Sequence, residues 1–213
     1  IHNFISRNFI ELADEDEEDI SDTTTFIVKH NKRAILDYYK NSAISFFVPA
    51  AYTAMSILEV DQIKFFQPDL VARYKFLQKL FTDEFSFDEE ITPEEQISKC
   101  LKGFINEGML VPDPTQPDML NLTSQGLRKL KWFAAFLLPF FESYKTCLLF
   151  LEKERTDKYD AKEQTKKIQS FGSKLYKRDN ISFKESLSLV NYRNAATYFA
   201  RNGINGSEDQ VEI

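Results

Sequence analysis

Glycine is scarce in this sequence, with six residues in 213, whereas phenylalanine is abundant, with twenty. Tight turns depend on glycine more than on any other residue, so the shortage argues against a fold rich in sharp turns. Long stretches of Leu, Phe, Ala, Lys and Glu favour helices instead. We therefore expect a mainly α fold, and the chain is long enough for one domain, or two small ones, with a real core.

Cysteine and histidine are also rare, with two residues of each. Cys100 and Cys147 lie in apolar, helical contexts, so we interpret them as buried free thiols in a reducing compartment and not as a disulfide. Neither they nor His2 and His30 form a cluster with zinc-ligand spacing. There is no glycine-rich phosphate loop and no nucleophile elbow. The sequence therefore indicates no catalytic residue, no metal and no cofactor.

Basic residues are fewer than acidic ones, with 27 Lys and Arg against 33 Asp and Glu, which gives a net charge of −6. This balance argues against broad binding to a phosphate backbone. Residues 12–22 carry seven acidic side chains in eleven positions, as is typical of a solvated linker. We expect an N-terminal segment and acidic linker over residues 1–22, a helical domain over residues 23–204 and a disordered tail over residues 205–213.

The chain begins with Ile1 and shows no signal peptide, so we expect it to be the C-terminal part of a longer protein. An uncharged stretch runs from Asn41 to Leu58, with Pro49 inside it. A membrane-spanning helix needs about 20 apolar residues, and this stretch is shorter and contains several Asn, Ser and Thr residues. We expect a buried pair of helices kinked or separated at Pro49. A surface that docks on a partner or a membrane is the alternative, and a true span fits worst.

Residues 61–131 show the order helix, helix, β-hairpin, helix. A capping box of Thr92 and Glu95 predicts the start of the second helix, and Gly108 its end. The hairpin strands are expected at residues 109–111 and 119–122. This order is that of a winged-helix-like module, so the expected fold class is a mainly α, helical domain with a winged-helix-like β-hairpin.

The helix in the recognition position, residues 93–106, begins with the carboxylates of Glu94 and Glu95. These groups would face phosphates, so we expect no nucleic-acid partner.

Apolar residues spaced by three and four from Leu130 to Leu151 predict one long helix that bends at Pro139. A second capping box, made by Ser182 and Glu185, predicts the start of the last helix, and Gly203 its end.

Three stretches carry a resemblance to a known family. The stretch "ILDYYKNSAISFFVPAAYTAMSIL" resembles the tyrosine-tyrosine-basic-asparagine motif and the following apolar helix of the glycerol-3-phosphate acyltransferase family. The resemblance is to the membrane-associated bacterial type, which is related to the mitochondrial enzyme and to dihydroxyacetone-phosphate acyltransferase. Residues 74–151 and 183–204 resemble later parts of the same family, in the same order, so the likeness covers about residues 33–204.

The catalytic signature of this family is His-x-x-x-x-Asp, in which the histidine is the general base and the aspartate orients it. The fifth residue after His2 is Arg7, and the fifth after His30 is Ile35. No catalytic residue is therefore carried over. The resemblance implies a non-catalytic C-terminal helical domain of an enzyme that transfers a fatty acyl group from acyl-CoA or acyl-ACP to the sn-1 hydroxyl of glycerol 3-phosphate.

The same resemblance implies the catalytic domain of the same polypeptide and a membrane surface as partners. It places a bacterial parent peripherally on the cytoplasmic face of the inner membrane, with this fragment soluble. Tyr38, Tyr39 and Asn41 either cap the apolar helix and fix its angle or contact the catalytic domain. The alternative function is a stand-alone winged-helix-like binding or regulatory module.

Overall fold

The computed structural model describes residues 1–13, 20–21, 24–60, 62–87, 90–154 and 159–205, and the side chains of residues 30, 33–43 and 45 lie outside this description. The chain divides into two compact units, Ile1–Phe47 and Val48–Ile213. Most of the acidic run and nearly all of the C-terminal tail lie outside the described residues. The expected linker, tail and domain limits therefore stay predictions.

The first unit combines short elements. They are α1 (His2–Ser6), β1 (Ile10–Leu12), β2 (Phe26–Val28), the 3-10 helix η1 (His30–Lys32) and the beginning of α2 (Arg33–Val60). Strands β1 and β2 pair antiparallel, with Ile10 opposite Val28. An ion pair of 2.8 Å between Lys29 Nζ and Glu11 Oε2 supports this hairpin. The β-branched segment that follows the acidic run thus forms a strand.

Helix α2 continues through Pro49 as one element, so a separation into two helices, one of the two outcomes expected at this proline, is wrong, and the other, a kink, stays a prediction. Proline removes one backbone donor and usually ends a helix. In the second unit, however, the turns after Pro49 are packed into the core, where Tyr52 and Ala54 are fully buried and Ile57 nearly so. Tertiary burial of these turns outweighs the local preference for a break.

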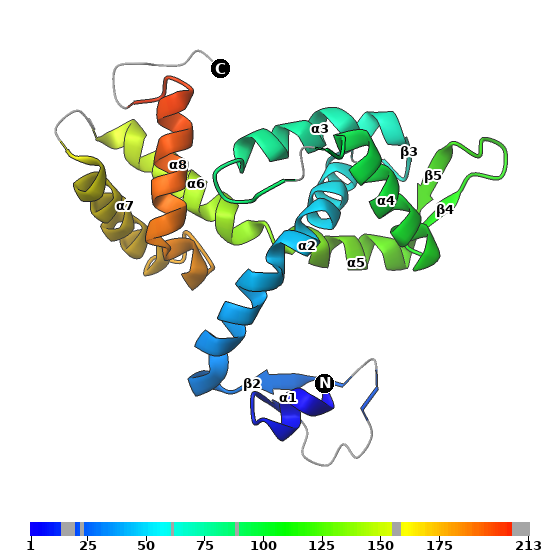
Figure 1. Ribbon diagram of the computed structural model, residues 1–213, viewed down its shortest axis with the longest axis horizontal. Coiled ribbons are helices and arrows are strands. Elements are labelled where there is room, and N and C mark those ends of the chain that lie inside the picture. The colour runs from blue at the N-terminus through cyan, green and yellow to red at the C-terminus, as the bar shows by residue number, and fades with distance from the viewer. Residues whose placement is uncertain (14–19, 22–23, 61, 88–89, 155–158, 206–213) are drawn as a thin grey trace. The chain divides into compact units, whose positions relative to one another are not determined.

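A three-stranded antiparallel sheet follows α2 in the order β3-β5-β4. Its strands are β3 (Lys64–Phe66), β4 (Leu110–Pro112) and β5 (Met119–Leu122), and the expected hairpin is confirmed as β4 and β5. Strand β3 was not predicted and pairs with β5, with Phe65 opposite Leu120 (Figure 1). Phe65, Leu110 and Leu120 are buried, because alternate residues of a strand face the same side.

Helices α3 (Gln67–Leu80) and α4 (Pro93–Asn106) connect β3 to β4 (Figure 1). The predicted capping box is confirmed: Glu95 N–H donates to Thr92 Oγ1 at 3.2 Å, and Thr92 N–H donates to Glu95 Oε2 at 2.9 Å. After α4 the chain turns at Gly108, whose φ of 66° favours glycine. The sequence therefore located both ends of this helix correctly.

The predicted long helix is two helices, α5 (Ser124–Ala135) and α6 (Leu138–Lys153), which meet at 52°. Pro139 lies in the first turn of α6. Its ring would collide with the carbonyl four residues earlier, that of Ala135, if the helix were continuous. The expected bend is therefore present as a complete break, with α5 ending at Ala135.

Helices α6, α7 (Ala161–Tyr176) and α8 (Leu189–Arg201) pack together, with the 3-10 helix η2 (Lys184–Leu187) before α8 (Figure 1). The prediction that the last helix begins at Ser182 is wrong, because α8 begins at Leu189 and is capped by Ser188. Glu142 of α6 accepts hydrogen bonds from Ser182 N–H at 2.7 Å, Phe183 N–H at 3.0 Å and Ser186 Oγ at 2.7 Å. A carboxylate distant in sequence thus replaces the local cap.

Aromatic rings form the centre of the second unit. Phe81, at the end of α3, is fully buried. Its ring centroid lies 6.3 Å from that of Tyr52 in α2 and 5.2 Å from that of Tyr144 in α6. The mainly α fold with a β-hairpin is confirmed, and phenylalanine contributes several of the buried rings of this core.

Replacing Gly126 by alanine should lower the free energy of unfolding by about 3 kcal/mol. A Cβ at this position in α5 would lie 2.0 Å from the Met109 carbonyl oxygen, so helix and backbone must separate. Gly103→Ala in α4 is the matched control. No heavy atom lies within 4 Å of its Cβ position, and the change should be neutral or stabilise by about 0.5–1 kcal/mol. Urea titrations of both variants would measure these effects, and equal losses would show that α5 does not pack closely on Met109.

Candidate functional site

Tyr38, Tyr39 and Asn41, the residues proposed from the sequence for a contact with another domain, lie in α2. Their side chains are outside the described residues. The structure therefore tests neither their role as caps nor their contact with another domain, and both stay predictions.

His2 is the one histidine of the two whose side chain the structure describes. His2 is exposed in α1, and the side chain of His30 is outside the described residues. In the part of the chain that the structure describes, no group of three or more His, Cys, Asp or Glu residues is placed to hold a metal ion.

Both cysteines are free thiols, as predicted, but only Cys147 is buried as expected, whereas Cys100 is half-buried. Burial raises the pKa of the Cys147 thiol to about 12 and also raises the pKa of the Cys100 thiol. A nucleophilic cysteine needs a lowered pKa so that its thiolate is populated near neutral pH. These two side chains therefore serve packing and not chemistry.

A half-buried polar cluster lies where the turn after α3 meets α8. Asn194 Nδ2 of α8 donates to the Asp83 carbonyl oxygen at 2.9 Å and to Glu84 Oε2 at 3.1 Å. Arg201 Nη2 forms an ion pair of 3.0 Å with Asp83 Oδ1. Two neighbouring carboxylates are thus bound to one helix that lies more than one hundred residues later in the sequence.

Glu84 has the electrostatics of a partly desolvated acid. Burial is the largest cause that raises the pKa of its carboxyl above the usual value, and contacts with Asn194 and Tyr144 act in the opposite direction. Burial also raises the pKa of the Tyr144 hydroxyl. A raised carboxyl pKa is a common property of general acids. Here its hydrogen bond joins two helices, and the described residues around it provide no paired nucleophile and base.

A cavity of about 790 Å³ opens beside this cluster. Asp83, Glu84 and Lys79 contribute its charged groups, and Phe85 and Phe87 contribute aromatic ones. Asp83 and Glu84 already bind α8, as described above. This arrangement could not be predicted from the sequence, because acidic residues in a loop usually remain solvated and Asn194 is remote along the chain.

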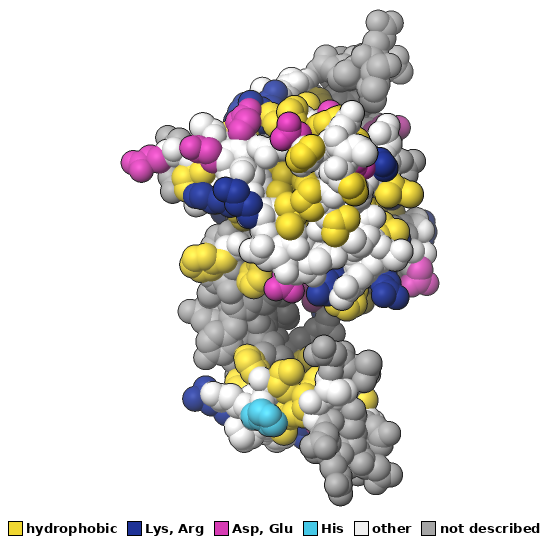
Figure 2. All heavy atoms as spheres, turned by 90° about the vertical axis from the view of Figure 1, so that its right-hand side faces the viewer, with side chains coloured by type: hydrophobic (Ala, Val, Ile, Leu, Met, Phe, Trp, Pro, Cys, Tyr) yellow, Lys and Arg dark blue, Asp and Glu magenta, His cyan; other side chains and the backbone are white. Residues whose placement is uncertain are grey.

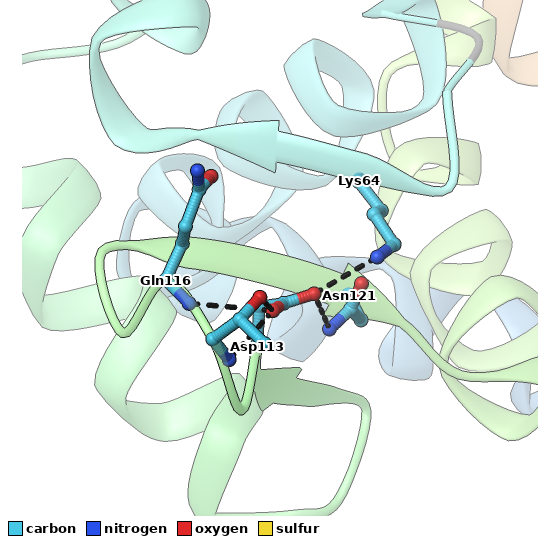
Figure 3. Close-up of polar contacts among 5 residues, drawn as sticks. Lys64, Asp113, Gln116 and Asn121 are labelled. Atoms are coloured by element: carbon cyan, nitrogen blue, oxygen red, sulfur yellow. Dashed lines mark hydrogen bonds and ion pairs between the residues drawn. The ribbon is translucent and has the colours of Figure 1, made fainter.

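Asp113 forms a second polar centre, at the turn between β4 and β5 (Figure 3). Its side chain is only 4% exposed and pairs with Lys64 Nζ of β3 at 2.9 Å. Oδ1 accepts hydrogen bonds from Thr115 Oγ1 at 2.7 Å and from Thr115 N–H at 2.9 Å, and Oδ2 accepts one from Asn121 Nδ2 at 3.3 Å. The hydrogen bond from Thr115, followed by that from Lys64, holds the pKa of this carboxyl well below its usual value. All of these contacts hold the hairpin turn.

Asp113→Asn should lower the stability of the chain, because the turn loses a charged acceptor. The ionised form is favoured by folding, so the contribution of Asp113 is present above its ordinary pKa of 3.8 and declines as the pH falls below it. The difference in free energy of unfolding between wild type and variant should therefore be largest at neutral pH and shrink toward pH 3.

Asp118→Asn, an exposed change in the same turn, is the matched control and should have little effect. Chemical denaturation at several pH values would measure both variants. A difference for Asp113→Asn that is constant with pH would contradict the role assigned to its charge.

Comparison with known proteins gives this helical unit its family. Residues 2–208 match the family described as the glycerol-3-phosphate acyltransferase C-terminal region. The chain belongs to this family. The resemblance found in the sequence is confirmed, and the match includes the first unit as well as the second.

Curated relatives of this acyltransferase C-terminal region are dihydroxyacetone phosphate acyltransferases. The protein of Oryctolagus cuniculus is 25% identical over 178 residues, which are 84% of this chain and 25% of the relative. The protein of Homo sapiens is 23% identical over the same coverage, and that of Bos taurus is 25% identical over 166 residues. The chain thus spans about a quarter of the length of the curated relatives that it matches.

Among the described residues, no single helix is both long and apolar enough to cross a membrane, although the bent pair of α5 and α6 reaches the length and composition of a span. On the face shown in Figure 2, basic and acidic side chains are interspersed with hydrophobic ones. That face carries no extended area of a single charge.

Proposed function

We propose that this chain is the non-catalytic C-terminal helical part of an enzyme of glycerolipid synthesis. The enzyme transfers a fatty acyl group from acyl-CoA or acyl-ACP to the sn-1 hydroxyl of glycerol 3-phosphate. In this proposal the chain supports and docks the catalytic domain of the same polypeptide, and the reacting groups belong to that domain. The family match over residues 2–208 is the observation that carries the proposal.

The contacts of the buried polar groups support a structural role. Glu142 binds the segment before α8, Asp113 binds the hairpin turn, and Glu84 binds α8. Each carboxylate joins segments that are distant in sequence. Such contacts hold the segments in fixed positions, so that another domain can bind against them.

The docking role is assigned to the tyrosine-tyrosine-basic-asparagine motif at the beginning of α2. Tyr38, Tyr39 and Asn41 contact the catalytic domain, and the enzyme works peripherally at a membrane surface. In a bacterial cell this surface is the cytoplasmic face of the inner membrane. The identity of the acyl acceptor needs a separate test. The proposed acceptor is glycerol 3-phosphate, whereas the curated relatives are named for dihydroxyacetone phosphate.

The isolated chain should not catalyse acyl transfer from palmitoyl-CoA or palmitoyl-ACP to glycerol 3-phosphate. A longer polypeptide that contains this chain and a His-x-x-x-x-Asp motif should do so. Radiolabelled glycerol 3-phosphate and labelled dihydroxyacetone phosphate, tested in parallel, would identify the acceptor. Turnover by residues 1–213 alone would contradict the non-catalytic assignment, and activity with dihydroxyacetone phosphate only would contradict the proposed acceptor.

Changing Tyr38, Tyr39 and Asn41 together to Ala in the longer polypeptide should reduce kcat/KM by about tenfold or more, which corresponds to about 1.4 kcal/mol of lost transition-state stabilisation. The expected cause is misplacement of the catalytic domain. The thermal unfolding midpoint of the isolated chain should change little, since the contact is with another domain. If the midpoint falls in the isolated chain and the activity falls with it, these residues are helix caps and the docking role is wrong.

A further inference from the structure

The solvent-facing side of α5 carries a tryptophan that is not part of the buried core. Gly126, Leu130 and Ala134 are the buried residues of this helix. Trp132, by contrast, is 72% exposed. With 3.6 residues per turn, Arg128 and Trp132 lie one above the other on the side opposite the buried residues. An aromatic side chain this large is normally at least half covered in a folded domain.

The same face is positively charged, although the chain as a whole is acidic. Helix α5 contains Arg128, Lys129 and Lys131 and no acidic residue. Lys129 is engaged at 3.7 Å by Glu107. Arg128 and Lys131 are exposed, and within the described residues neither of them forms an ion pair. Two available cations thus flank the exposed indole.

An exposed apolar side chain extends this face of α5. Leu127 is 40% exposed. The indole and Leu127 provide apolar surface, and Arg128 and Lys131 provide positive charge beside it. We call the surface made by Leu127, Arg128, Lys131 and Trp132 the α5 surface.

We propose that the α5 surface binds the headgroup region of an anionic lipid bilayer. Tryptophan favours the boundary between headgroups and acyl chains, because its ring is apolar and its N–H remains polar. Arginine and lysine are attracted to anionic headgroups, with their alkyl stems against apolar surface. The α5 surface presents both kinds of group side by side.

The charge of the α5 surface favours an anionic bilayer over a folded protein partner. Arg128 and Lys131 are exposed beside the indole, and an anionic headgroup layer offers negative charge wherever these cations meet it. A folded partner is normally anchored in a well-packed pocket, and none of the α5 residues lines the cavity beside Glu84. This inference rests on the proposed function in one respect, since both place the enzyme at a membrane. Lipid binding is measured without any substrate, so its test does not depend on acyl transfer.

Trp132 provides a direct readout, because it is the only tryptophan in the chain. The intact 213-residue chain would be titrated with vesicles of phosphatidylcholine containing 30% phosphatidylglycerol, and with vesicles of phosphatidylcholine alone. We expect a blue shift of the tryptophan emission and protection from iodide quenching with the anionic vesicles only. Both effects should weaken as the salt concentration rises.

Variants distinguish binding through the α5 surface from non-specific attraction between basic residues of the chain and the anionic vesicles. Arg128→Gln with Lys131→Gln should weaken vesicle binding about 25-fold, at about fivefold for each cation near an anionic membrane. Lys162→Gln with Lys166→Gln, two exposed lysines of α7, is the matched control and should bind like the wild type. Trp132→Ala, followed by vesicle co-sedimentation, should also weaken binding, while Val190→Ala, an exposed apolar change in α8, should not.

The result that would overturn the proposal is an unchanged tryptophan spectrum with anionic vesicles at low salt, or equal binding by the α5 and α7 variants. A spectrum that changes only when the catalytic part of the polypeptide is added would assign the α5 surface to an interdomain contact and also overturn it. Acyl transfer by the longer polypeptide is assayed separately in detergent, so failure of lipid binding and failure of the proposed activity can be told apart.

Discussion

The packing of aromatic rings around Phe81 is the interaction on which the second unit depends. This ring lies at the end of α3 and contacts Tyr52 of α2 and Phe141 and Tyr144 of α6. It therefore connects the helices beside the sheet with those of the C-terminal helical group. Large aromatic side chains contribute more buried area than any others, and edge-to-face pairs add directional preference. The angle between α5 and α6 matters because it brings the rings of α6 to Phe81.

Besides the aromatic core, carboxylates form contacts that hold segments of the second unit together. Glu142 binds the segment before α8, Glu84 binds Asn194, and Asp113 binds the hairpin turn and β3. A carboxylate that receives several hydrogen bonds is costly to remove, because its donors are left without partners. These contacts account for the burial of the acidic residues that make them. They agree with a domain whose task is to hold a shape for a neighbouring domain and, as we propose, to contact a membrane through α5.

Membership of the acyltransferase C-terminal family gives this architecture a setting. The relatives are about four times as long as the aligned segment, since that segment is a quarter of their length. In the proposals above, the catalytic domain binds through the motif in α2, and the lipid bilayer binds through α5.

The sequence by itself determined the helical class, the family and features that depend on neighbouring residues, such as the cap of α4 at Thr92, the turn at Gly108 and the β4–β5 hairpin. Tertiary structure decided that α2 continues past Pro49, that β3 joins the sheet, that Glu142 replaces the local cap before α8 and that Glu84 meets Asn194. Caps and turns arise from hydrogen bonds within a few residues, so their pattern is visible in the chain. Contacts between remote segments depend on burial and on packing that no short stretch of sequence contains.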